Sequence, residues 1–174
     1  MSPPALAPAL KDGKVDAVVS WEPYNTAVLE QVPDSYIVLR GGGHLSYIMV
    51  ATAHEPTIQS NPELIRNFVV GLAAASQYTR KNRDEAVEIF ANWVPDVNLA
   101  VAKKAIQYIS YDPRVSPSVM QAFEAAEDDI LKLTLKDAPR LDIREQFASL
   151  FLTEVQQAHP EYFNDLPPLP VENR

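Results

Sequence analysis

The residues with the clearest potential for binding chemistry are consecutive: Trp21-Glu22-Pro23-Tyr24. They follow an apolar run, residues 15–20, whose pattern predicts a buried strand, and the proline suits the first turn of a helix. Ligands of open α/β sheets bind at such strand ends, and the free N–H groups of a helix start attract anions. The aromatic rings could cover an apolar ligand body or hold a cation. Packing of Trp21 as a structural anchor is the alternative interpretation.

Glu22 fits poorly in an anion site, so it is expected either to face a cationic group such as an amine or to pair with a residue outside this chain. A second candidate feature is the run Gly41-Gly42-Gly43-His44, which matches neither the dinucleotide-binding nor the phosphate-loop spacing. Because glycine absorbs changes in φ and ψ, these three glycines predict a hinge.

No catalytic residue, metal site or cofactor is predicted. The chain has no cysteine, which excludes thiol catalysis, disulfides and thiolate–metal sites. His54-Glu55 begins like a zinc-binding helix, but position 58 is Ile58 rather than a second histidine. The three histidines are far apart, and we interpret them as surface or hinge residues.

The elements that would position these residues predict an α/β protein with few strands and many helices. Three apolar or β-branched runs predict strands: residues 15–20, 36–39 and 45–52. Helical spacing and capping signals predict helices over residues 4–11, 23 to about 31, 61–78, 84–93, 96–109, 116–130 and from 142 onward. Prolines predict an extended tail from His159. Three strands form a small sheet for so many amphipathic helices, which indicates that their apolar faces cover something outside this chain.

The overall composition restricts the classes of partner that the chain could bind. The net charge of −8 argues against a nucleic-acid surface, which would be basic. No apolar run is long enough to predict a transmembrane helix. The N-terminal residues also lack the basic and apolar regions of a signal peptide.

Residues 9–24 resemble the nitrate/sulfonate/taurine-type solute-binding proteins of ABC importers. The resemblance lies in the sequence Gly13-Lys14-Val15-Asp16-Ala17 followed by Trp21-Glu22-Pro23. It extends more weakly through residues 47–51 and 61–78, and covers roughly residues 3–135. The family has the type II periplasmic-binding-protein fold, in which two α/β lobes close on a ligand.

The resemblance implies a division of the chain and a set of site residues. Residues 1–40 would belong to the second lobe, 41–46 to a hinge crossover, 47–138 to the first lobe, and 139–174 to a C-terminal helix and proline-rich tail. The family's leading half would then be absent. Trp21, Glu22, Pro23 and Tyr24 would bind the ligand.

The function expected from the resemblance is the binding of a small, anionic organic solute, such as a sulfonate, taurine or nitrate. The protein would not be an enzyme, would deliver the solute to a membrane permease, and would be periplasmic or anchored outside the cell at full length. The alternatives are a thiamine-pyrimidine-precursor or menaquinone-pathway enzyme on the same fold, or an inactive truncated domain. Without the leading half, self-association is also expected.

Overall fold

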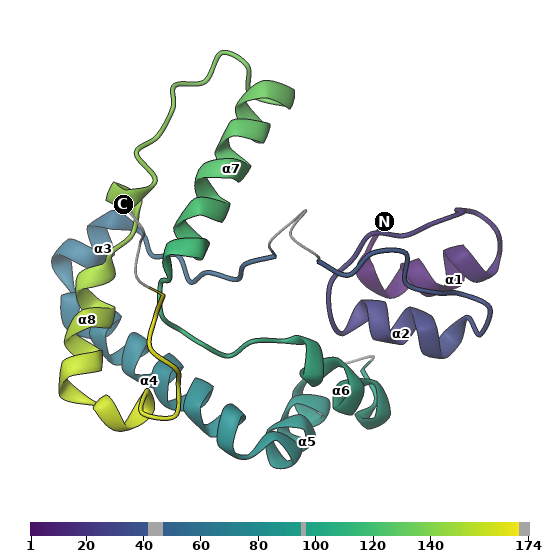
Figure 1. Ribbon diagram of the computed structural model, residues 1–174, viewed down its shortest axis with the longest axis horizontal. Coiled ribbons are helices and arrows are strands. Elements are labelled where there is room, and N and C mark those ends of the chain that lie inside the picture. The colour runs from purple at the N-terminus through teal and green to yellow at the C-terminus, as the bar shows by residue number, and fades with distance from the viewer. Residues whose placement is uncertain (42–46, 95–96, 171–174) are drawn as a thin grey trace. The chain divides into compact units, whose positions relative to one another are not determined.

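The computed structural model describes residues 1–41, 47–94 and 97–170, and it divides the chain into two compact units. Unit 1 consists of Met1–Arg40 and Tyr78–Tyr111, and unit 2 of Gly41–Gln77 and Asp112–Arg174. The regular elements of the described residues are all helices (Figure 1). The expected α/β class is therefore wrong, because the described residues form no strand.

Unit 1 is a cluster of short helices around one apolar core. Its elements are η1 (Pro3–Ala5), α1 (Leu6–Lys11), α2 (Tyr24–Gln31), α5 (Arg83–Trp93), α6 (Leu99–Ala105) and η2 (Ile106–Tyr108). Helix α2 contacts both α1 and α6, and α5 packs on α6. The buried core joins Val87 of α5 to Val101 and Ala102 of α6, with Val97 and Ile106 beside them.

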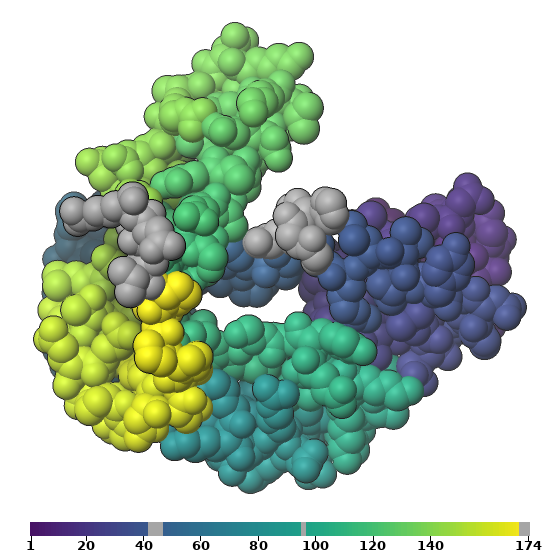
Figure 2. Space-filling view, viewed as in Figure 1, coloured from purple at the N-terminus to yellow at the C-terminus, as the bar shows by residue number. Residues whose placement is uncertain are grey.

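Unit 2 is built around the long helix α4, whose last turn extends into unit 1. Its elements are α3 (Glu55–Ser60), α4 (Pro62–Lys81), α7 (Pro117–Leu133), η3 (Arg144–Gln146), α8 (Ser149–Ala158) and η4 (Pro160–Tyr162). Helix α8 lies along α4 (Figure 1), and the core between them holds Ala73, Val155 and Phe163. Helix α7 and the segment after it stand clear as a projection (Figure 2), so Leu133 is 78% exposed.

All three predicted strands are wrong in the residues that the structure describes; residues 45 and 46 of the third lie outside them. The segments have no regular structure, and their apolar side chains reach solvent: Val19 is 91% exposed, Val38 83% and Met49 79%. A strand is stable only beside a hydrogen-bonding neighbour, whatever its own propensity. Among the described residues these segments have no such neighbour, so they form no strand despite their β propensity.

The predicted helices are largely confirmed, because their start signals act locally. Ser116 accepts a hydrogen bond from the Val119 backbone N–H and begins α7, as its position before Pro117 predicts. The helix expected to begin near Asp142 instead begins at Ser149, after the 3-10 turn η3. The tail beyond His159 also contains a 3-10 turn, η4, which begins at Pro160 and precedes the other three prolines.

The start of α6 supplies a stability prediction. The Asn98 side chain accepts a 2.9 Å hydrogen bond from the Val101 backbone N–H. We expect Asn98→Ala to lower the free energy of unfolding by about 1 kcal/mol, because an orphan N–H loses its acceptor. Asn98→Asp keeps an acceptor and serves as the control. Urea denaturation followed by circular dichroism checks this, and equal stability of the alanine and aspartate variants would contradict it.

Candidate functional site

The Trp21-Glu22-Pro23-Tyr24 motif lies at the start of α2 in unit 1, with Pro23 in the N-cap position. Residues 15–20 form no strand, so a sheet edge no longer supports a site here. The remaining support for a site is the arrangement of the motif's own side chains. The Trp21 and Tyr24 rings meet edge to face, with their centroids 5.8 Å apart. Trp21 is 40% exposed, so the pair presents aromatic surface to solvent.

The Glu22 carboxylate is fully engaged within the chain. Its Oε2 accepts hydrogen bonds from the Thr26 backbone N–H at 3.2 Å and from the Thr26 hydroxyl at 2.7 Å. Its Oε1 forms an ion pair with Nη1 of Arg40, and the Glu22 side chain is only 9% exposed. The carboxylate therefore holds the first turn of α2 and is neutralised by a residue of this chain. It does not repel an anion as a free carboxylate would.

Arg40 completes the cluster, and the sequence reasoning missed it. Its guanidinium carbon lies 3.7 Å from the centroid of the Tyr108 ring, a cation–π contact. The side chain is 28% exposed, and within the described residues its hydrogen bonding is through Nη1 to Glu22. Nε and Nη2 can then donate to a second acceptor, such as a carboxylate or sulfonate oxygen.

An apolar pocket of about 160 Å³ adjoins this cluster within unit 1. It shares Pro23 with the motif, and η2 supplies Ile106 to the pocket and Tyr108 to the cluster. The lining residues are Pro23, Thr79, Ala86, Val87, Phe90, Ala102, Ala105, Ile106, Ile109 and Tyr111. Burial raises the pKa of the Tyr111 hydroxyl, with a smaller opposing effect from Arg83, so Tyr111 is a neutral hydroxyl at pH 7. The pocket offers apolar walls with a few polar groups, and its volume is below the roughly 300–1,000 Å³ of typical ligand sites, so it could hold only a few ligand atoms.

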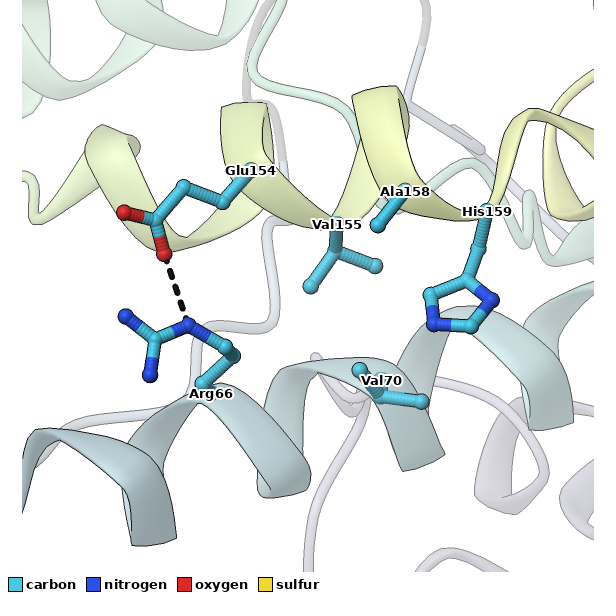
Figure 3. Close-up of a pocket in the computed structure, with 6 residues that line it drawn as sticks. All are labelled: Arg66, Val70, Glu154, Val155, Ala158 and His159. Atoms are coloured by element: carbon cyan, nitrogen blue, oxygen red, sulfur yellow. Dashed lines mark hydrogen bonds and ion pairs between the residues drawn. The ribbon is translucent and has the colours of Figure 1, made fainter.

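Unit 2 has a second hollow, between α4 and α8, of about 320 Å³ (Figure 3). Val70, Val155 and Ala158 form its apolar part; the Arg66–Glu154 ion pair lies toward one end and His159 toward the other (Figure 3). That ion pair is 2.8 Å long and half-exposed. The imidazole Nδ1 lies 3.2 Å from a Glu161 carboxylate oxygen. Arg66 and His159 each have a carboxylate partner here, so the hollow does not concentrate charge of one sign.

The remaining candidates lie partly outside the described residues. Gly41 has a positive φ of 63°, a backbone conformation that glycine adopts without steric cost. Gly42, Gly43 and His44, the rest of the predicted hinge, are not among the described residues. His54 takes the N-cap position of α3 and provides no side-chain cap.

The described residues contain no group of three or more His, Cys, Asp or Glu side chains arranged to hold a metal ion. Within the same residues, no helix has the length and apolar character needed to cross a membrane.

Comparison with known protein families, curated proteins and solved structures found no match to this chain. The interpretation of the cluster therefore depends on its chemistry and on the motif resemblance.

Proposed function

We propose that this chain binds a small organic anion in unit 1 and serves as the solute-binding component of an ABC importer. The observation that supports the binding site best is the Glu22–Arg40–Tyr108 cluster. It neutralises the carboxylate that opposed an anion site and leaves guanidinium donors beside the Tyr108 ring. The Trp-Glu-Pro sequence resemblance supports the importer role.

The role proposed for each residue of the site follows from the chemistry of its side chain. Arg40 donates to the anionic head group, because its planar guanidinium pairs well with two-oxygen acceptors. Trp21 and Tyr24 cover the ligand's body. The pocket behind Pro23 takes an apolar tail of a few atoms, in keeping with its volume of about 160 Å³. Glu22 keeps Arg40 in place rather than touching the anion.

Tryptophan fluorescence tests this proposal, because the chain has only two tryptophans, Trp21 and Trp93. Trp93 is 82% exposed, so Trp93→Phe removes its emission at little cost to stability and leaves Trp21 as the only reporter. We expect ethanesulfonate or taurine to change the Trp21 emission with saturation.

Lys104→Met provides a matched control for that titration. It removes a cation of the same unit, paired with Glu30 and exposed, and should leave the titration unchanged. If sulfonates, taurine and nitrate all leave the Trp21 emission unchanged, the proposed site is refuted.

A further inference from the structure

The hydroxyl of Ser20 is buried without a hydrogen-bond partner. Among the described residues, its Oγ is the one buried side-chain nitrogen or oxygen atom that lacks such a partner. By contrast, the buried Thr26 hydroxyl donates a 2.7 Å hydrogen bond to Glu22. Burying a hydroxyl without a partner costs stability, because its hydrogen bonds to water are lost and none replaces them. Such an atom needs an explanation, and a ligand that pairs with it is one.

Ser20 belongs to the same helix start as the proposed site. Its carbonyl accepts a 3.1 Å hydrogen bond from the side-chain nitrogen of Asn25. The carbonyl of Trp21, the next residue, accepts a 3.1 Å hydrogen bond from the Asn25 backbone N–H. These two bonds tie residues 20 and 21 to the first turn of α2, where Glu22 pairs with Arg40. The unpaired hydroxyl and the guanidinium therefore lie at the same end of α2.

A small local movement is enough to bring the hydroxyl to a ligand. Ser20 is itself only half-buried, and its neighbours Val19 and Trp21 are exposed, so the hydroxyl lies just beneath the surface. Residues 15–21 form no regular element, and such segments rearrange at low cost. Rotation about χ1 alone redirects a serine hydroxyl. Binding can therefore uncover this group without unfolding α2.

We propose that Ser20 is a further ligand-binding residue, whose hydroxyl donates a hydrogen bond to the anionic head group that Arg40 holds. This role depends on the anion site proposed for unit 1. The planar guanidinium of Arg40 presents donors that match two acceptor oxygens. A sulfonate has a third oxygen outside that plane, and the Ser20 hydroxyl can pair with it. A carboxylate has only two oxygens, so Ser20 should favour a sulfonate over a carboxylate of the same chain length.

Calorimetric titration of the full chain with ethanesulfonate and with propionate tests this role. We expect Ser20→Ala to bind ethanesulfonate about tenfold more weakly than wild type, as the loss of one hydrogen bond to a charged group predicts. The affinity for propionate should fall less, so the preference for the sulfonate should narrow. A residue that only supported the fold would weaken the binding of both anions equally.

Thermal unfolding of the ligand-free chain provides a second measurement, in which the change has the opposite sign. Because Ser20→Ala removes an unpaired hydroxyl, its unfolding midpoint should rise by about 2–4 °C. Ser35→Ala is the matched control: the Ser35 hydroxyl is also half-buried in unit 1, but it donates a 2.6 Å hydrogen bond to the Val32 carbonyl. That variant should unfold at a lower temperature than wild type and bind ethanesulfonate equally well.

Two results would overturn the role of Ser20 and leave the anion site standing. In the first, wild type and Ser20→Ala bind ethanesulfonate with equal affinity. In the second, Ser20→Ala unfolds at a lower temperature than wild type, which would mean that the hydroxyl already has a partner within the fold. If wild type binds neither ethanesulfonate nor propionate, the proposed anion site itself is wrong, and the role of Ser20 with it.

Discussion

Replacing Phe163 with alanine should lower the free energy of unfolding of unit 2 by about 3 kcal/mol. The ring is only 9% exposed and packs with Ala73 of α4 and Val155 of α8, which are each 1% exposed. Truncation removes the largest side chain of this core and leaves a void that two helices cannot close without moving. The core is small, so the loss is a large share of its stability.

Urea denaturation followed by far-ultraviolet circular dichroism measures that loss. Leu133→Ala is the matched control, since that side chain is 78% exposed and should change stability by less than about 0.5 kcal/mol. If Phe163→Ala and Leu133→Ala are equally stable, the tail does not pack on α4 as described.

Arg40→Met should destabilise unit 1 by about 2–3 kcal/mol, because it leaves the Glu22 carboxylate without its cation at 9% exposure. The hydrogen bonds from Thr26 remain, but they cannot replace a full positive charge. Adding Glu22→Gln should recover much of the loss, since a neutral amide still accepts the Thr26 hydrogen bonds and needs no counter-charge.

A double-mutant cycle over Glu22 and Arg40 measures this coupling. The comparison is Lys104→Met, which breaks an exposed ion pair with Glu30 and should cost less than about 1 kcal/mol. Additive effects of Glu22→Gln and Arg40→Met, with no recovery in the double variant, would show that the two side chains do not interact in solution.

The helices could be predicted from the sequence because their signals act over a few residues. Ser116-Pro117 begins α7, and the predicted helix from Asn61 corresponds to α4. Leu64, Phe68 and Leu72 follow helical spacing within α4, and the spacing alone does not show that all three side chains are exposed. The strand predictions were wrong because a strand depends on a pairing partner that can lie far away in the sequence. Residues 36–39 have strong β propensity, yet a strand also needs a neighbour, which propensity does not supply.

Only part of the candidate site could be predicted from the sequence. The aromatic and proline residues of the motif could be identified from their order alone. The ion pair of Glu22 with Arg40 joins residues 18 positions apart, and the stacking on Tyr108 joins residues far more distant. No single helix contains both residues of either pair, so only the tertiary structure reveals them. A basic residue directly before the glycine run was the one available signal.

Isothermal titration calorimetry with ethanesulfonate and taurine tests the central claim most directly. It compares the wild-type chain with the Glu22→Gln/Arg40→Met double variant, which avoids an unpaired buried charge. We predict saturable one-to-one binding by wild type. Binding by the double variant should be at least about tenfold weaker, with its circular dichroism unchanged, because the guanidinium donors are gone. Equal affinity of the two proteins, or no binding by wild type to any anion offered, would contradict the claim that Arg40 holds a small organic anion.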